Sequence, residues 1–222
     1  MYNLELIKTK DGSNTLFVPE LNETYHSKHG AVTESKHVYI DMGLRHCVDI
    51  GLSTVNILEV GFGTGLNWFL TLNFFKNNNI EINYETLEKY PLDSSLMVEY
   101  FKDIEEFKEI DIKYYHQMAW EVNVEVERGI TFLKKQSDLL EIEFEHEKFD
   151  LIYFDAFAPN KQPELWTAEV FLKIYKSLKI NGFLVTYCAQ GDFKRTLKKV
   201  GFQVECLPGP PFKKEMTRAF KK

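Results

Sequence analysis

A glycine-rich turn in the first half of the chain restricts the possible folds more than any other feature. An apolar run at 55–60 reads as a buried strand, and G-F-G-T-G follows it directly at 61–65. Apolar residues then recur at helical spacing over 66–74. Glycines between a strand and a helix let the backbone turn sharply and let a ligand lie against it. The sequence therefore predicts an α/β fold with a ligand site at this turn.

Strands and helices alternate along the rest of the chain. The expected strands lie at 55–60, 80–87, 130–134, 149–154, 183–188, 202–207 and 216–220. Further helices are expected at 96–104, within 115–128, at 170–178 before Asn181-Gly182, and at 193–200. Crossover helices give a mainly parallel sheet, but the turn at 209–211 is too short for a crossover. The prediction is a Rossmann-like, mostly parallel seven-stranded sheet with an antiparallel C-terminal hairpin, the outline of class I methyltransferases.

The N-terminal segment has a different pattern. Two strand-like runs within 3–18 flank a turn at Lys10–Ser13, which predicts a β-hairpin. We expect residues 1–50 to form a small hairpin and loop extension packed on the core. Residues 51–222 are expected to form the methyltransferase domain as a single structural unit.

Composition limits the class of protein. Hydrophobic residues make up 44% of the 222 residues and charged residues 27%, which are ordinary globular values that argue against disorder. No run approaches the ~20 apolar residues of a membrane span, and the N-terminus has no apolar signal-like segment. We therefore expect a soluble, cytoplasmic protein. Cys47, Cys188 and Cys206 are widely separated, so we expect buried thiols and neither disulfides nor a zinc site.

Charge is distributed unevenly along the chain. The net charge is −6, but residues 194–222 carry nine basic and two acidic side chains, so 9 − 2 = +7 there and −6 − 7 = −13 elsewhere. A basic end on an acidic protein can face phosphate groups. The alternative is a solvated C-terminal helix and hairpin, which position alone favours.

The acid before the glycine turn helps to choose the ligand. Glu59 lies two residues before Gly61, and the run continues through Gly63 and Gly65 without the spacing of the dinucleotide fingerprint. A carboxylate at this point suits the cationic amino group and sulfonium of S-adenosylmethionine, whereas it would repel a pyrophosphate. The alternative is a tight turn with a structural glutamate.

Two further acids follow successive strands. Glu88 comes directly after the strand at 80–87, where a carboxylate can accept hydrogen bonds from both ribose hydroxyls of a nucleoside. Asp138, followed by Leu139, comes after the third strand and can accept from an adenine amine, or it can cap a helix. Glu88 by itself supports any ribose ligand and does not distinguish S-adenosylmethionine from NAD.

The segment after the fourth strand is the most informative about the reaction. Asp155 is followed by Ala156, Phe157 and Pro159 at the strand end where ligands of open α/β sheets bind. A carboxylate here can hold an amino group by its N–H bonds and leave the lone pair free for methylation. Phe157 can flank a planar base, and Pro159 stiffens the wall. The alternative is an aspartate that only caps the turn.

One histidine pair resembles a metal motif. His26 and His29 have H-x-x-H spacing, but they lie in an expected loop with no cysteine nearby. Hydrogen-bonded histidines are favoured there, and no metal is expected.

These residues together resemble the MnmC methyltransferase-domain family. The most specific runs are Asp155–Pro159 with Gln162–Thr167, and Gly209–Thr217, which is similar to a "G-K-R-E-M" element. Leu58–Asn67 and the segment from Tyr25 to Leu44 also resemble it, so that the resemblance covers nearly the whole chain.

The resemblance implies S-adenosylmethionine-dependent N-methylation of 5-aminomethyl-(2-thio)uridine at the wobble position of tRNA. It implies Asp155 as the catalytic residue. It also implies the cofactor residues Glu59, Gly61, Gly63, Gly65, Asn67, Glu88, Asp138 and Leu139. The implied substrate residues are Tyr25, Phe157, Pro159, Lys213, Lys214 and Arg218.

The chain departs from the family pattern in two ways. The bifunctional members carry a C-terminal FAD-dependent oxidase domain, and the sequence given ends at Lys222, so we expect a stand-alone form that uses no FAD. Phe212 stands where the pattern usually has glycine. Methylation of a small-molecule or protein amine, and a catalytically silent module that binds S-adenosylmethionine, are kept as alternative functions.

Overall fold

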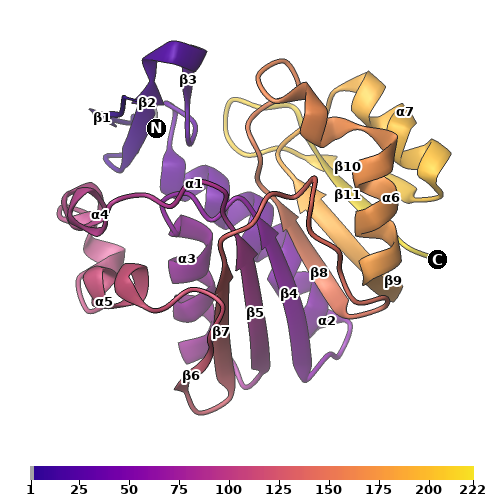
Figure 1. Cartoon of the computed structure of the whole chain (residues 1–222), viewed down its shortest axis with the longest axis horizontal. Helices are drawn as coiled ribbons and strands as arrows, with labels where there is room; N and C mark the ends of the chain where they lie inside the picture. Colours follow the sequence, from indigo (N-terminus) through magenta and orange to yellow (C-terminus); the bar gives the residue numbers. More distant parts are fainter. Residues whose placement is uncertain (1–2) are drawn as a thin grey trace.

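The computed structural model describes residues 3–222, which form one large and one small β-sheet (Figure 1). The strands of the large sheet are β4 Thr54–Val60, β5 Glu81–Leu87, β6 Asn123–Glu127, β7 Ile130–Lys135, β8 Phe149–Phe154, β9 Leu178–Thr186, β10 Gln203–Pro208 and β11 Glu215–Phe220. Their order across the sheet is β10-β11-β9-β8-β4-β5-β7-β6. The pairs among β4, β5, β7, β8 and β9 are parallel. β10 and β11 form the antiparallel end, which confirms the class I methyltransferase fold.

The helices cover both faces of this sheet. They are α1 Ala31–Ser35, the π-helix η2 Lys36–Leu44, α2 Arg45–Asp49, α3 Leu66–Lys76, α4 Ser94–Phe101, α5 Ile112–Gln117, α6 Ala168–Ser177 and α7 Gly191–Val200. Three 3-10 turns complete the set: η1 Pro19–Leu21, η3 Glu105–Phe107 and η4 Pro163–Trp166. In Figure 1, α6 and α7 lie together beside β8 and β9.

Alternation along the strands divides the core into two layers. In β8, Leu151 and Tyr153 pack with η2 and α3, whereas Ile152 and Phe154 pack with α6 and α7. All four side chains are fully buried. Successive strand residues point to opposite faces, so a strand covered by helices on both sides must be apolar throughout. This explains why the run at 149–154 was readable as a strand from sequence.

The sheet has one strand more than predicted. The segment expected to be helical within 115–128 divides into α5 and β6, and β6 pairs antiparallel with β7 at the sheet edge. The sequence of β6, N-V-E-V-E, alternates with period two, but its side chains are only exposed or half-buried. The helix expected within this segment exists only at its start, where α5 ends at Gln117, and β6 was missed because an edge strand with so little apolar burial gives a weak periodic signal.

The start of β9 also differs from the prediction. Asn181 and Gly182 were expected to end a helix, but both lie inside β9, which begins at Leu178 directly after α6. Asn181 has φ 63°, and the register between β8 and β9 shifts here. The turn-like dipeptide therefore forms an irregularity within the strand and does not end the helix.

The N-terminal segment forms more than a hairpin. β1 Glu5–Lys8, β2 Asn14–Val18 and β3 Glu23–Thr24 make a three-stranded antiparallel sheet, drawn in indigo and set apart from the large sheet in Figure 1. The helical run at 31–49 then packs on the large sheet, with Tyr39 and Leu44 fully in its core. The predicted division at residue 50 thus assigns the helical run at 31–49, which covers the large sheet, to the N-terminal extension. Residues 1 and 2 of that extension lie outside the described residues.

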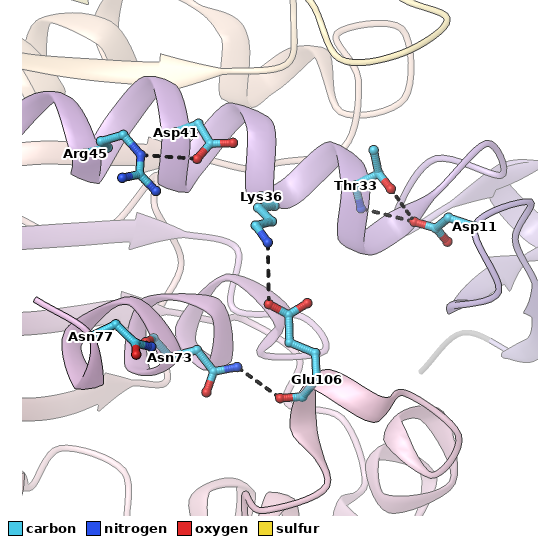
Figure 2. Close-up of polar contacts among 8 residues, drawn as sticks. All are labelled: Asp11, Thr33, Lys36, Asp41, Arg45, Asn73, Asn77 and Glu106. Carbon is cyan, nitrogen blue, oxygen red and sulfur yellow. Dashed lines mark hydrogen bonds and ion pairs between the residues drawn. The ribbon is translucent and has the colours of Figure 1, made fainter.

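Asp11 fixes the hairpin turn onto the first helix. Its Oδ1 accepts hydrogen bonds from Thr9 and from Ser13, and its Oδ2 accepts from the backbone and hydroxyl of Thr33 at 3.1 and 2.8 Å (Figure 2). Burial alone would raise the pKa of Asp11, but these hydrogen bonds lower it to about 2. Figure 2 also shows Lys36 reaching Glu106, 3.9 Å away, which ties η2 to the segment before α5.

The β10–β11 connection contains a tight turn with an unusual residue. The Lys213 backbone N–H donates to the Pro210 carbonyl at 2.9 Å, and Phe212 has φ 73°. Proline fixes φ at Pro211 near −65°, so these features define a type II turn with Phe212 at the position that favours glycine. A non-glycine residue there costs about 1–2 kcal/mol. The departure from the family pattern at Phe212 is therefore a strained backbone position.

Candidate active site

A cavity of about 410 Å³ opens where β4, β5 and β8 end. The predicted residues that line it are Tyr25, Gly61, Gly63, Glu88, Asp138, Leu139, Asp155, Phe157 and Lys213. The predicted residues that do not line it are Glu59, Gly65, Asn67, Pro159, Lys214 and Arg218. Carboxyl ends of parallel strands meet at one edge of the sheet, and this brings loops distant in sequence together.

The glycine turn packs too closely against its neighbours for side chains. A Cβ at Gly61 would lie 2.6 Å from the Asp155 carbonyl oxygen, and Gly61 has φ 90°. A Cβ at Gly63 would lie 3.1 Å from the Tyr25 ring. Gly65 does not line the cavity. It has φ 78°, and a Cβ there would lie 2.9 Å from the Phe62 ring. The turn therefore needs glycine for its own conformation, and Gly61 and Gly63 leave backbone exposed to the cavity.

Glu88 is held in place by backbone groups. Its Oε2 accepts from the Gly63 N–H at 2.9 Å, and its Oε1 accepts from the Tyr90 N–H at 2.8 Å. Burial raises the pKa of Glu88, although these backbone donors oppose the rise. Each carboxylate oxygen keeps a free lone pair after one such bond, and two hydroxyls of a ribose would complete both.

The Asp138 carboxylate contacts both a backbone N–H group of the turn that follows it and the Lys89 ammonium. Its Oδ1 accepts from the Leu140 backbone N–H at 2.9 Å, and its Oδ2 lies 2.6 Å from the Lys89 ammonium. Burial alone would raise the pKa of Asp138, but Lys89 and the Leu140 N–H lower it below its usual value. Leu139 is 5% exposed and provides an apolar surface beside this carboxylate. Asp138 lines the cavity, but the alternative prediction that it caps a helix was wrong, because the residues after it form a turn and no helix.

Asp155 lies at the base of the cavity, directly after β8. Its Oδ2 accepts from the Asn67 side-chain amide at 2.8 Å. Burial raises the pKa of Asp155 to about 6, although the Tyr39 hydroxyl and the Asn67 amide lower it. A carboxylate with a pKa near neutrality can change protonation state under ordinary conditions, so it can accept a proton during a reaction.

Glu59 lies behind Asp155 and does not line the cavity. Its side chain is fully buried, with Oε1 accepting from Asn67 at 3.1 Å and Oε2 accepting from the Thr86 hydroxyl at 2.7 Å. Burial raises the pKa of Glu59 to about 8. Asn67, 2% exposed, therefore connects the two acids. The end of β4 thus directs the Glu59 side chain into the core and away from the cavity lining.

The segment after Asp155 is braced by its own motif. The Trp166 indole N–H donates to the Phe157 carbonyl at 2.8 Å, and the Phe157 backbone N–H donates to the Gln162 side chain at 3.1 Å. The Phe157 and Tyr25 rings meet edge to face, with centroids 5.1 Å apart. The F-A-P and P-x-x-W runs thus fix an aromatic ring at the cavity wall.

Lys213 enters the cavity from the β10–β11 connection. Its ammonium lies 2.5 Å from a carboxylate oxygen of Glu34 and 4.7 Å from the centroid of the Tyr187 ring. All three side chains line the cavity. The Tyr187 hydroxyl donates to the Ala156 carbonyl at 2.8 Å. Pro159 and Lys214 instead line a shallower depression that shares Tyr187 and Lys213 with the main cavity.

The Arg218 side chain does not line the cavity and is held by other contacts. Its guanidinium donates to Glu205 from Nε at 3.0 Å and from Nη2 at 2.9 Å, and to the Met42 carbonyl from Nη1 at 3.3 Å. Only 13% of its side chain is exposed. Its place on β11 turns it toward η2, so the structure offers no support for the predicted contact with phosphate. Ion pairs also engage other basic residues of the C-terminal end, namely Lys194, Arg195 and Lys221.

The histidines and cysteines have ordinary surroundings. The His26 Nε2 lies 2.9 Å from the Thr64 hydroxyl, and burial lowers the pKa of His26 to about 4. The His29 ring stacks on Phe212. Within residues 3–222, no group of three or more potential metal-binding side chains is found. Cys47 and Cys188 are buried as predicted, but Cys206 is exposed, because it lies on the edge strand β10.

Three residues that contribute to this site were not predicted from the sequence. Tyr187 follows the end of β9, so the strand-end rule that identified Asp155 also applies to it. Glu34 and Tyr39 lie on the helical run at 31–49, and no sequence pattern indicates that this run would face β8. Tyr39 is 1% exposed and, with Asn67, adjusts the pKa of Asp155.

The cavity suits S-adenosylmethionine in size and in donor chemistry. Its volume lies in the usual range for small-ligand sites. Glu88 offers oxygen acceptors suited to a ribose, and Leu139 with Asp138 offers an apolar surface and an acceptor suited to adenine. Asp155 and Gly61 line the same cavity as these groups and as the Tyr25 and Phe157 rings. Carboxylates outnumber ammonium groups in the lining, which favours a cationic ligand.

Comparisons with known proteins agree with this site. Residues 93–222, more than half of the chain, match a family described as S-adenosyl-L-methionine-dependent methyltransferase. A tRNA 5-methylaminomethyl-2-thiouridine biosynthesis bifunctional protein MnmC from Leptospira borgpetersenii is 32% identical over 209 residues, covering 88% of this chain and 32% of the relative. An MnmC protein from Campylobacter hominis is 28% identical, covering 75% and 25%.

The chain thus spans about a third or less of the length of these curated relatives. Among solved structures, MNMC2 from Aquifex aeolicus matches with a TM-score of 0.80 and 24% identity, covering all of this chain and 71% of that one. This likeness supports the fold. Because the family match covers most of the chain, the protein belongs to the S-adenosyl-L-methionine-dependent methyltransferases, as an MnmC-type methyltransferase domain.

Proposed function

We propose that the chain methylates the amino nitrogen of 5-aminomethyl-(2-thio)uridine at the wobble position of tRNA. One observation carries the proposal: Asp155 lines the same cavity as the glycine turn and the Tyr25 and Phe157 rings, and burial raises its pKa to about 6. The relatives named for 5-methylaminomethyl-2-thiouridine biosynthesis support the choice of substrate.

In this proposal the chain's residues prepare an amine. When bound, S-adenosylmethionine supplies an electrophilic methyl group. Asp155 accepts an N–H hydrogen bond and takes the proton that the nitrogen gives up, because an ammonium has no lone pair for attack. Tyr25 and Phe157 flank the uracil ring of the substrate, and the close packing around Gly61 keeps the reacting groups near one another.

The proposal is tested by methyl transfer to defined tRNA. Purified chain and S-adenosylmethionine are incubated with tRNA that carries 5-aminomethyl-2-thiouridine, and the nucleosides are analysed by mass spectrometry. We expect conversion to the methylaminomethyl nucleoside. Conversion of small-molecule or protein amines, with tRNA left unchanged, would replace the proposed substrate and keep the methyltransferase.

A salt titration tests the contact with RNA separately. Lys214 is exposed at the shallower depression, so Lys214→Ala should reduce the salt dependence of tRNA affinity by about one unit of slope. Lys222, also exposed but at the C-terminus, is the matched control. If both alanine variants keep the wild-type slope, Lys214 does not touch phosphate.

A further inference from the structure

An exposed aromatic pair lies beside the cavity and has no role in the site described above. The rings of His29 and Phe212 stack with centroids 4.7 Å apart and planes 24° apart. Phe212 is 73% exposed, the largest exposed fraction among the exposed large hydrophobic side chains of the described residues. Phe212 also occupies the turn position that favours glycine. An apolar ring that is both exposed and backbone-strained does not stabilise the folded chain, which points to a role in binding.

Both rings are tied closely to the cavity. Lys213, the next residue after Phe212, lines the cavity and pairs with Glu34. Ser27, which also lines the cavity, accepts a hydrogen bond from the His29 backbone N–H at 3.2 Å. Phe212 is therefore one residue, and His29 two residues, away in sequence from a residue that lines the cavity.

One ammonium group lies over the pair. The Lys10 ammonium lies 5.5 Å from the centroid of the Phe212 ring, and the Lys10 backbone N–H donates to the Lys28 carbonyl at 3.1 Å. Asp11, through its bonds to Thr33, holds this part of the chain against α1. Lys10 therefore places positive charge beside the aromatic face, whereas the Lys28 ammonium lies 5.0 Å from the centroid of the Phe17 ring.

We propose that the His29–Phe212 pair stacks on a nucleobase of the anticodon loop next to the modified uridine. The inference rests on the proposed function. An exposed aromatic ring with an ammonium group beside it is an arrangement that binds single-stranded nucleic acid, with stacking on the base and charge on the phosphates. The proposed substrate is itself an RNA loop, and this favours a nucleobase over a protein side chain as the partner of the ring. In this arrangement, the base next to the modified uridine leaves the stack of anticodon-loop bases and contacts the aromatic pair. The modified uridine itself enters the cavity past Lys213.

The test uses an anticodon stem-loop RNA that carries 5-aminomethyl-uridine at the wobble position. Phe212→Gly removes the ring and suits the turn, so it should fold at least as stably as the wild type. We expect its KM for the stem-loop to rise about 10-fold, the loss typical of one base–aromatic stack, with the Kd for S-adenosylmethionine unchanged. Phe212→Tyr should retain wild-type KM. Tyr114→Ala, which removes a ring that is 52% exposed on α5, is the control and should change nothing.

Stacking is measured directly with 2-aminopurine. Two stem-loops carry the probe on either side of the wobble position, and one of them should be quenched by the wild type but not by Phe212→Gly. Methyl transfer by the wild type, combined with equal KM and equal quenching in Phe212→Gly, would overturn this inference and leave the proposed function standing. Absence of methyl transfer by the wild type to any tRNA would overturn the proposed function and this inference with it.

Discussion

Two groups of residues line the same cavity but are assembled differently. The proposed cofactor group, defined as Gly61, Gly63, Glu88, Asp138 and Leu139, comes from the ends of β4, β5 and β7. The substrate group, Tyr25, Glu34, Phe157, Tyr187 and Lys213, comes from the N-terminal sheet, α1, the segments after β8 and β9, and the β10–β11 turn. In the first group, Glu88 is held by backbone N–H groups of neighbouring strand-end loops, whereas the second group depends on side-chain contacts between segments much farther apart in sequence.

This difference predicts how each group responds to change. A substitution in the cofactor group removes a contact that its own loop has oriented, so it should affect cofactor affinity alone. A substitution in the substrate group also alters the electrostatic environment of Asp155, because Glu34 and Lys213 both act on its pKa. The predictions below test that distinction.

Asp155→Asn should have the largest effect. It keeps the size and one acceptor oxygen for Asn67 but removes the proton acceptor, so kcat should fall on the order of 100-fold or more. Wild-type kcat should rise with pH through about 6, as the carboxyl loses its proton, and the variant should lack this limb. The variant should still bind S-adenosylmethionine and should partly recover at high pH, where more amine is neutral. A variant with wild-type kcat at pH 7 would exclude Asp155 from catalysis.

Glu88→Ala should weaken binding of S-adenosylmethionine and of its demethylated product, measured by calorimetry. Hydrogen bonds to a charged group contribute about 1.5–3 kcal/mol, so the Kd should rise roughly 10- to 100-fold. Glu88→Gln keeps one acceptor oxygen for the Gly63 or Tyr90 N–H and controls for disruption of the loop. If both variants bind with wild-type Kd, ribose is not held by this carboxylate.

Substitutions at Glu34 and Lys213 should shift the pH profile of kcat by smaller amounts and in opposite directions. The Glu34 charge raises the pKa of Asp155, and the Lys213 charge lowers it. Glu34→Gln should therefore move the acid limb of kcat to lower pH, and Lys213→Met should move it to higher pH, each by less than about one unit. Shifts in the same direction would contradict the assignment of this limb to Asp155.

Glu59→Gln should have the smallest effect, visible only in stability. Burial raises the pKa of Glu59 from 4.5 to about 8, so the folded state holds the proton more tightly than the unfolded state. The free energy of unfolding therefore falls as pH rises between these values, and the variant lacks that loss. The Tm of the variant relative to wild type should increase from pH 6 to pH 9. Glu109→Gln, at an exposed position, is the control, and a constant difference for Glu59→Gln would disprove the linkage.

The membrane and fold expectations can be compared with the structure in the same way. Among residues 3–222, every helix is too short or too polar to span a bilayer.

The parallel strands were predictable because burial on both faces leaves a continuous apolar run, as in β8. β6 was not predictable, because an edge strand buries little and its alternation is carried by only two valines.

By itself, the sequence determined that Asp155 and the residues of the proposed cofactor group lie at strand ends, because a strand end and its loop are local features and parallel strands deliver them to one edge. Only the tertiary structure decided that Asn67 joins Glu59 to Asp155, and that Lys213 meets Glu34. Such pairings join segments far apart along the chain, and their partners are fixed by packing of helices and sheets that no local pattern encodes. Arg218 illustrates the same limit, since its charge was visible in the sequence but its engagement with Glu205 was not.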